Sequence, residues 1–285
     1  LKVRNVSYQA FVSEYRGHAG KLAAEICAMD DNDICLVAVG GDGTANEVIN
    51  GITDFEKVRF GVIPTGSGND LARGLSLSKD PKNGAIHILN AMKKSREDTW
   101  CMDLGEVNFG EKKRLFAISA GIGLDALVCK KALKSTIKDI LNKIRLGKLT
   151  YLVLTVQSLF TMQTADAEIF FDREEGLQKK RMIFTAAMNF KAEGGGVPVA
   201  PAASACDGKL SFCEAAGIPK WRTFLCLPFL VAAKHTSIHG FSVTDAKDCT
   251  IRLSRPMVVH ADGEYCGEVT EVHFHCLPGK LRVLK

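Results

Sequence analysis

The first hundred residues alternate short apolar runs with segments of helical periodicity. Residues Ile34–Val39 are continuously apolar and end at two glycines, as expected for a strand buried on both faces of a parallel sheet. A helix is predicted directly afterwards at Thr44–Ile52. The same succession follows, with a strand predicted at Arg59–Ile63 and helices at Gly68–Leu75 and Asn83–Met92. Strand, glycine loop and helix in repetition predict a parallel sheet covered by helices.

From about Trp100 the pattern changes to short strands separated by polar turns, with helical interruptions predicted over 126–162 and 220–234. This pattern is typical of an antiparallel, sandwich-like block. We therefore expect an α/β domain over residues 1–98 and a β-rich domain over 99–285, with a helical insertion at 126–162. The predicted strands are Trp100–Val107, Arg114–Ser119, Ala165–Phe171, Arg181–Asn189, Lys209–Ala215, Asp248–Leu253, Met257–Ala261 and Glu271–Cys276.

The composition is that of a globular protein with a substantial core. The 285 residues are 46% hydrophobic and 24% charged, which excludes a disordered or collagen-like chain. The two most apolar stretches, Leu149–Phe160 and Thr223–Ala233, are shorter than the ~20 residues of a spanning helix. No signal peptide is expected, and a start at Leu1 instead of Met indicates a sequence that begins inside a longer chain.

The ten cysteines contain no Cys-x-x-Cys pair and lie mostly in apolar runs. We expect small buried side chains in a reducing cytoplasm. His273, His275 and Cys276 could indicate zinc, but the alternation His-Phe-His is better interpreted as one face of a strand.

Two glycine-rich loops stand where a predicted strand precedes a predicted helix. Glycine lets the backbone approach a ligand closely, and a helix N-terminus offers free amides to an anion. A carboxylate in such a loop implies Mg²⁺ between it and a phosphate. Because neighbouring parallel strands end at the same edge of a sheet, both loops would face one crevice. Either loop alone could be a tight turn, but together they predict a Mg-nucleotide site at Gly40, Gly41, Asp42, Gly43, Thr44, Gly66, Ser67, Asn69 and Asp70.

Two Asp-Gly pairs in the β-rich half carry a second candidate chemistry. The predicted strand 257–261 ends in Asp262-Gly263-Glu264, and a carboxylate there could take the proton from a substrate hydroxyl. Asp207-Gly208, with Ser204 nearby, could form an oxygen-rich cation site. Asp-Gly is also the commonest hairpin turn, so a purely structural role stays open for both pairs.

The motifs resemble, in sequence and in order, the diacylglycerol kinase catalytic family of lipid kinases, which includes bacterial diacylglycerol kinases and sphingosine kinases. The resemblance covers nearly the whole chain. It implies an α/β domain of the NAD kinase and diacylglycerol kinase type followed by a β-sandwich-like domain. The motifs that carry it are Gly40–Thr44, Pro64–Asp70, Asn189 with Gly194–Gly196, Ala200–Ala202, Asp207–Leu210 and His260–Glu264.

The resemblance also implies roles for single residues. Asp42, Thr44 and Asp70, with Ser67 and the glycine amides, match positions that line the ATP and Mg²⁺ site. Asp262 matches the general base, with Glu264 beside it. The remaining matches are to a structural Mg²⁺ site formed by Ser204, Asp207 and the backbone oxygen of Lys209.

This chain departs from the family pattern at three places. The family's opening strand and first nucleotide loop are absent from the sequence. Ser67 replaces the usual Thr and keeps the hydroxyl, whereas Cys206 stands where a second Asp is common, which removes one potential metal ligand.

The net charge of +5 is concentrated in residues 130–148, which hold seven basic side chains against one acidic. Apolar residues recur there at helical spacing. Such a helix either lies on an anionic membrane surface or packs on the protein by its apolar stripe. Nucleic acid is disfavoured because aromatic side chains are sparse near the basic clusters. The basic residues are Lys130, Lys131, Lys134, Lys138, Lys143, Arg145 and Lys148.

These observations predict an ATP- and Mg²⁺-dependent kinase that phosphorylates a lipid hydroxyl, with diacylglycerol as the expected substrate. It would act in the cytoplasm as a peripheral protein of the inner membrane surface, and a homodimer is left open. Two alternatives remain: a soluble kinase related to NAD kinase, and a catalytically idle, nucleotide-responsive membrane binder.

Overall fold

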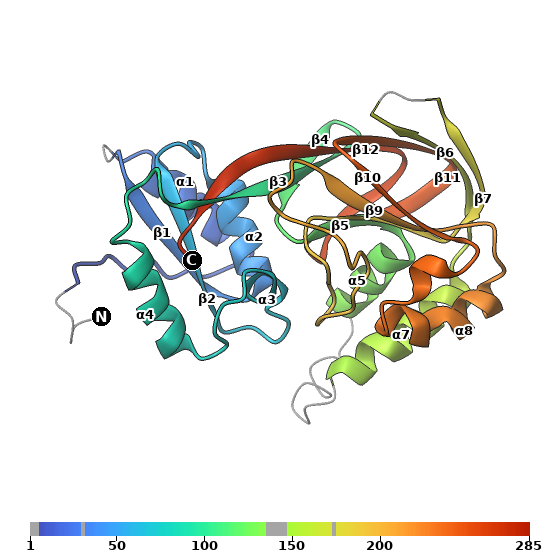
Figure 1. The fold of residues 1–285 in the computed structure, drawn as a ribbon, viewed down its shortest axis with the longest axis horizontal. Coiled ribbons are helices and arrows are strands. Elements are labelled where there is room, and N and C mark those ends of the chain that lie inside the picture. The colour runs from blue at the N-terminus through green and yellow to red at the C-terminus, as the bar shows by residue number, and fades with distance from the viewer. Residues whose placement is uncertain (1–5, 30–31, 135–146, 173–174) are drawn as a thin grey trace.

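The computed structural model describes residues 6–29, 32–134, 147–172 and 175–285, and it shows two structural regions joined through their strands (Figure 1). In the N-terminal region, parallel strands alternate with helices, as the apolar pattern predicts. Its elements are α1 (His18–Cys27), β1 (Ile34–Gly40), α2 (Asp42–Gly51), β2 (Val58–Pro64), α3 (Asp70–Gly74) and α4 (Pro81–Ala91).

Helices cover both faces of the β1–β2 pair. Side chains of a strand alternate between faces, and Leu36 of β1 packs in one cluster with α1 and α2. Its neighbour Val37 packs instead in a second cluster with Ile88 of α4. The strand run is therefore apolar because helices pack on both of its faces, although Val39 near its end is exposed.

The C-terminal region is antiparallel, and the helices described in it lie at one end (Figure 1). β5, β8, β9 and β10 follow β11 in spatial order, each strand antiparallel to its neighbour. The elements are β3 (Trp100–Phe109), β4 (Lys112–Phe116), β5 (Ser119–Gly123), α5 (Leu124–Lys134), α7 (Gly147–Thr161), β6 (Ala165–Phe171), β7 (Leu177–Met182), β8 (Phe184–Met188), β9 (Leu210–Ala215), α8 (Lys220–Val231), the 3₁₀ turn η2 (His235–Ser237), β10 (Phe241–Ala246), β11 (Asp248–Ala261) and β12 (Glu264–Val283).

Strand β12 joins the two regions. Its 20 residues pair with β11 and β3, and its last residues then pair in parallel with β2 through Arg282–Arg59 and Val283–Phe60. The strand runs from the β-rich region into the N-terminal one (Figure 1). The strand predicted at 271–276 is therefore much too short, because β12 continues through polar and proline-containing positions whose pairing partners come from distant segments.

Other predicted boundaries differ in ways that local patterns do not reveal. The predicted strand 114–119 is two strands, β4 and β5, and the predicted strands near 248–253 and 257–261 are one strand, β11, with a register shift between Arg252 and Met257. The predicted helical insertion contains α5 and α7, and its residues 135–146 lie outside the described part. Helix α1 and strand β10 were not predicted.

Within the described ranges, no helix combines the length and apolar character needed to cross a membrane. Five of the ten cysteines are buried, whereas Cys101 and Cys206 are exposed.

Candidate active site

The ends of β1 and β2 place the two glycine-rich loops side by side. The strands pair in parallel up to Gly40 and Pro64. A Cβ on Gly66 would stand 2.5 Å from the Cα of Gly41, so glycine is needed where the two loops touch. Asn69 closes the second loop by accepting from the Gly66 amide at 3.0 Å and donating to the Gly66 carbonyl at 2.7 Å.

Asp42 links the first loop to the second. Its carboxylate oxygens accept from the backbone amides of Asp70 and Leu71, each at 3.0 Å. Those amides open α3, where a carboxylate is favourable. Burial raises the pKa of the Asp42 carboxyl. Asp42 therefore holds the relative position of the two loops, and its contact with Mg²⁺ stays a prediction.

Asp70 connects the second loop to a third glycine-rich segment. It is buried, pairs with Arg73 and accepts from the amide of Gly195 at 2.9 Å. Gly195 and its neighbours Gly194 and Gly196 all have positive φ, between 59° and 102°, a conformation that favours glycine. A segment of the β-rich region thus depends on a carboxylate of the N-terminal one.

The start of α2 offers polar groups to a ligand. The amides of Gly43 and Thr44 lie in the first helical turn, where an α-helix supplies no acceptor of its own. The Glu264 side chain reaches this turn from the other region, since its Oε1 would be 3.3 Å from a Cβ on Gly43. Glu264 also forms an ion pair with Arg16. Ser67, on the second loop, is exposed.

Asp262 is held by four hydrogen bonds. One carboxylate oxygen accepts from the Asn46 side chain and the Ala117 amide, both at 2.8 Å. The other accepts from the amides of Ile118 at 2.8 Å and Ser119 at 3.1 Å. Burial raises the pKa of Asp262 above its ordinary value, although the hydrogen bonds oppose this shift. The carboxylate has a fixed orientation and an increased tendency to hold a proton.

Asp262 forms part of the hairpin turn and also carries the carboxylate that is the candidate base. Asp262 and Gly263 have φ of 47° and 81°, the positive pair needed in a tight turn between antiparallel strands, here β11 and β12. Asn46, the side-chain donor to Asp262, lies one turn into α2, and Arg114 donates to its Oδ1 at 2.9 and 2.5 Å. The turn therefore brings the carboxylate to the helix that begins at the first loop.

Three ionisable residues lie beside Asp262: His260, which the sequence interpretation took as a strand residue, and Asp125 and Glu193, which it missed. His260 is buried and lies 3.1 Å from Asp125 Oδ2, and Glu193 accepts from the Ser119 hydroxyl. Burial raises the pKa of Glu193. Burial alone would lower the pKa of His260, but the hydrogen bond to Asp125 and the surrounding carboxylates outweigh it, so the pKa is raised.

One sequence signal could have located this cluster. Gly121 lies inside β5, where glycine commonly marks a close approach. A Cβ there would be 1.8 Å from Asp125 Oδ2, so the glycine makes space for that carboxylate. Asp125 Oδ1 is buried and has no hydrogen-bond partner within the described part of the chain.

The predicted structural metal ligands share one turn. Asp207 Oδ1 accepts from the Lys209 amide at 3.1 Å, and Ser204 Oγ lies 3.5 Å from Cys206 Sγ. Asp103 fixes the turn by accepting from the amide of Gly208 at 2.7 Å. Ser204 and Asp207 retain oxygen atoms of the kind Mg²⁺ prefers, and the site stays a prediction.

Comparisons with known proteins match both regions. Residues 1–102 match the family described as "Diacylglycerol kinase catalytic domain", and residues 119–285 match "YegS C-terminal NAD kinase beta sandwich-like domain". The chain is 30% identical over 285 residues to a Bacillus subtilis protein named "Putative lipid kinase YtlR", covering 98% of this chain and 90% of that one.

Two further relatives agree. The B. subtilis protein named "Diacylglycerol kinase" is 28% identical over 251 residues, covering 86% of this chain and 75% of its own length. A solved structure titled as a "putative diacylglycerol kinase" from Bacillus anthracis superposes with a TM-score of 0.73 at 22% identity, covering 95% of this chain and 84% of that one. That structural likeness supports the α/β plus β-sandwich fold.

Proposed function

Because the chain belongs to the diacylglycerol kinase catalytic family and is a lipid kinase, we propose that it transfers the terminal phosphate of Mg-ATP to the hydroxyl of diacylglycerol. The product would be phosphatidic acid. One contact carries the proposal: the hydrogen bond from Asn46 to Asp262. It joins the candidate base to the helix whose first turn would face the phosphates.

The spacing along α2 suits phosphoryl transfer. Asn46 follows Asp42 by four residues, which is about 6 Å along a helix. A hydroxyl held by Asp262 would therefore lie within about one helical turn of a phosphate bound at Gly43 and Thr44. In-line transfer needs this proximity, with a carboxylate to accept the proton and donors to balance the phosphate charge.

Asp262 accepts the hydroxyl proton in this proposal. Its four acceptor positions are all used, three of them by backbone amides. The Asn46 side chain is the one donor that can rotate away, so the substrate hydroxyl would take its place. The raised pKa of Asp262 supports proton acceptance from an alcohol.

The N-terminal loops bind the nucleotide in this proposal. Amides of Gly41 and Gly43 and the hydroxyls of Thr44 and Ser67 would face the phosphates. The oxygen donors of Asp42 and Thr44 fit a hard cation, and Mg²⁺, when bound, neutralises phosphate charge.

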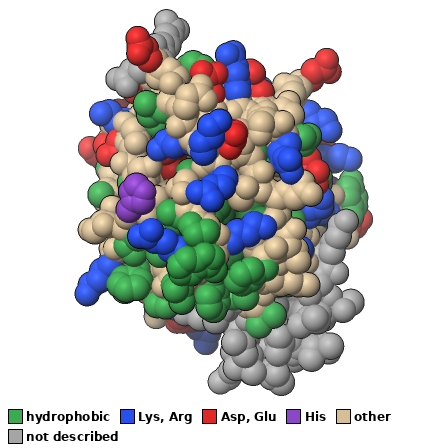
Figure 2. All heavy atoms as spheres, turned by 90° about the vertical axis from the view of Figure 1, so that its right-hand side faces the viewer, with side chains coloured by type: hydrophobic (Ala, Val, Ile, Leu, Met, Phe, Trp, Pro, Cys, Tyr) green, Lys and Arg blue, Asp and Glu red, His purple; other side chains and the backbone are tan. Residues whose placement is uncertain are grey.

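Access to a lipid requires a membrane-facing surface, and α8 supports one. Trp221, Leu225 and Phe229 recur every four residues on one side of the helix, with exposed fractions of 60%, 56% and 49%. Figure 2 shows one hydrophobic patch on this side of the molecule, with Lys and Arg side chains beside it. Large apolar side chains beside basic ones are typical of helices that lie in a membrane interface.

The basic segment 130–148, for which the sequence predicts a membrane contact, is described only in part, so that contact stays a prediction. Lys130 pairs with Glu268 at 2.5 Å, and Lys131 donates to Thr161 at 3.1 Å, so both side chains contact the protein. Residues 135–146, which carry further lysines, lie outside the described part. We place the principal membrane contact on α8.

A labelled-ATP assay tests the chemistry. Purified protein is incubated with labelled ATP, Mg²⁺ and, in turn, micelles of diacylglycerol, micelles of a sphingoid base, or NAD. Labelled phosphatidic acid in the first arm is expected. Label in NAD alone would overturn the proposal in favour of a soluble kinase, and ATP binding without any product would favour the idle binder.

Vesicle binding tests the membrane surface. Trp221→Gln, Leu225→Gln and Phe229→Gln are compared with Ile86→Gln, which changes an exposed side chain on α4 at the far end of the molecule (Figure 1). Burying each α8 side chain in acyl chains is worth about 1.5–3 kcal/mol, so each change should weaken binding to anionic vesicles roughly tenfold or more. Equal binding by all four variants would refute the α8 contact.

A further inference from the structure

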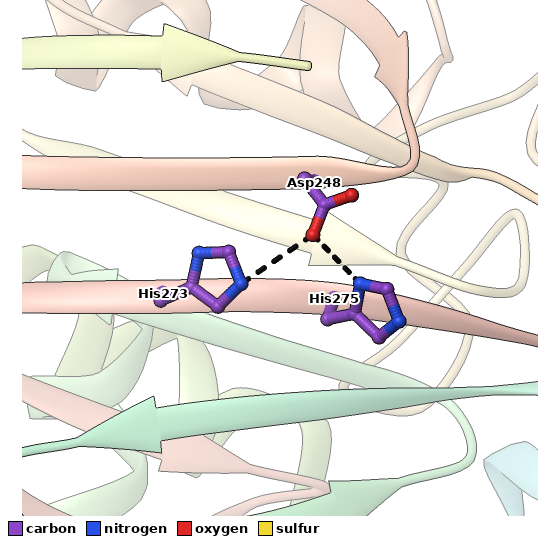
Figure 3. Close-up of side chains that lie close together, drawn as sticks. All are labelled: Asp248, His273 and His275. Carbon is purple, nitrogen blue, oxygen red and sulfur yellow. Dashed lines mark hydrogen bonds and ion pairs between the residues drawn. The ribbon is translucent and has the colours of Figure 1, made fainter. Parts of the chain in front are cut away.

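A cluster of two histidines and an aspartate lies on strands β11 and β12 (Figure 3), at the end of this hairpin that is remote from the Asp262–Gly263 turn. Asp248 pairs directly with His275, and Thr250 pairs with His273. Side chains opposite each other in a sheet point to the same face. The intervening Cys249 and Phe274 are buried on the other face, so the cluster is the polar side of this hairpin.

The pairing corrects part of the sequence interpretation. His273 and His275 do share one face of a strand, and Cys276 lies on the opposite, buried face. The third member, Asp248, comes from a different strand, so no local spacing pointed to it. The sequence interpretation disfavoured zinc because His-Phe-His alternates as one face of a strand, and it named Cys276, not Asp248, beside the two histidines.

The three side chains converge on one point. Asp248 Oδ1 is 2.7 Å from His275 Nδ1 and 3.4 Å from His273 Nε2. One ligand atom from each residue lies within 4.8 Å of the others. In a tetrahedral zinc site with bonds of about 2.0–2.2 Å, ligand atoms are about 3.3–3.6 Å apart. Small side-chain rotations would therefore give three ligand positions.

The residues around the cluster suit a metal-binding role. Thr250 Oγ1 lies 2.9 Å from His273 Nδ1, and a hydroxyl there can accept the Nδ1 proton while Nε2 offers its lone pair to a cation. Asp172 accepts from the amides of Lys247 and Asp248 at 2.9 and 2.8 Å, which fixes the start of β11. Thr250 can therefore orient the His273 ring, and Asp172 fixes the backbone that carries the Asp248 carboxylate.

Charge and space also favour a cation. Glu106 of β3 lies opposite His275 of β12 in the strand register, which adds another carboxylate to the same face of the sheet. A hollow of about 400 Å³ beside the cluster leaves room for water on an ion. It is lined by Phe170, Asp172, Asp248, Thr250, Arg252 and His273.

We propose that Asp248, His273 and His275 bind a divalent transition-metal ion of the zinc type, with one position open to water. Two imidazoles and one carboxylate match the ligands that zinc and its neighbours accept, whereas Mg²⁺ prefers oxygen alone. The ion would cross-link β11 to β12 and so stabilise the hairpin whose turn carries Asp262. The proposal does not depend on the lipid substrate.

The test compares metal binding by the full chain and its variants. Zn²⁺ binding is measured by equilibrium dialysis with elemental analysis, and the zinc-induced rise in melting temperature is recorded against an EDTA reference. His273→Ala, His275→Ala and Asp248→Asn should each lose one bound zinc and its thermal shift. Thr250→Val should bind roughly 10–100-fold more weakly. His87→Ala, an exposed histidine on α4, should behave as wild type.

Co²⁺ identifies the ligands, because the ten cysteines of the chain could bind metal elsewhere. A nitrogen and oxygen site gives visible d–d absorption without the thiolate charge-transfer band that cysteine adds. Loss of the d–d absorption in His273→Ala supports the proposal. Failure of the wild type to bind zinc, unchanged spectra and stoichiometry in the variants, or a signal carried entirely by thiolate would each overturn it. If an alanine variant melts below wild type in EDTA, His275→Gln and Thr250→Val decide the result.

Discussion

Replacing Asp262 by Asn tests whether its carboxylate is both a structural acceptor and the catalytic base. The amide keeps one oxygen, so two of the four present donors would face an NH₂ group in either orientation. Each unsatisfied buried donor costs about 1–3 kcal/mol, which gives about 2–6 kcal/mol for the pair. At about 2–4 °C per kcal/mol for chains of this size, the melting temperature should fall by roughly 5–20 °C.

Turnover should fall further than this loss of stability explains. A general base contributes roughly 10²–10⁴-fold to the rate, and the amide cannot accept the proton. Turnover is measured with labelled ATP and diacylglycerol micelles well below the melting temperature. Nucleotide affinity is measured by calorimetry in the same buffer, and it should change little because the loops that would bind ATP are left intact.

Asn46→Ala is the matched control, because it removes a donor to Asp262 and keeps the carboxylate. It disturbs the same contact between α2 and the hairpin, so it reports what loosening this contact does to the rate. Asp262→Asn should be at least tenfold slower than this control. Equal turnover in the two folded variants would refute the base role, and an unchanged melting temperature would refute the hydrogen-bond accounting.

Three further predictions concern the loops and the pH profile. Gly66→Ala would place a Cβ 2.5 Å from the Cα of Gly41, so the Mg-ATP affinity measured by calorimetry should fall at least tenfold. The control Gly84→Ala, where a Cβ has no neighbour closer than 4.0 Å, should bind Mg-ATP normally, and equal affinities in the two variants would contradict the packing of the loops. Asp42→Ala removes the acceptor for two helix-opening amides, at about 1–3 kcal/mol for each amide, and should weaken Mg-ATP binding at least tenfold by the same measurement. Unchanged affinity would count against the role of Asp42. Because the pKa of Asp262 is raised, its base form is lost on acidification at a higher pH than for an ordinary aspartate, so kcat/KM should fall through an apparent pKa above 3.8 as the pH is lowered. The contribution of Asp262 to the free energy of unfolding should change in the opposite sense and decrease as the pH rises through the same window. An acidic limb of kcat/KM that is the same in Asp262→Asn would assign that pKa to a neighbouring group instead.

Local patterns predicted well wherever an element is determined by its own residues. The run 34–39 is apolar because both faces of β1 are covered, and the helix after it begins at Asp42 because glycines end the strand. Such signals depend on side-chain period and turn chemistry within a few residues. β12 was truncated in the prediction because its ends are stabilised by β3, β11 and β2, segments distant in the chain.

The candidate site divides in the same way. The glycines, Asp42, Asp70 and Asp262 were predicted because loops after strands and Asp-Gly turns are local features. Asn46 was not, since its importance comes from a hydrogen bond to a residue 216 positions away.

Residue type and short spacing were enough to identify the family, the α/β and β-rich composition, and the glycines and carboxylates that can meet a phosphate. Which of these groups contact one another depends on the three-dimensional fold. It joined Asp262 to α2, gathered Asp125, Glu193 and His260 beside it, and paired Asp248 with two histidines of β12. Strand pairing sets these contacts, and the register between distant strands follows from the packing of the whole sheet.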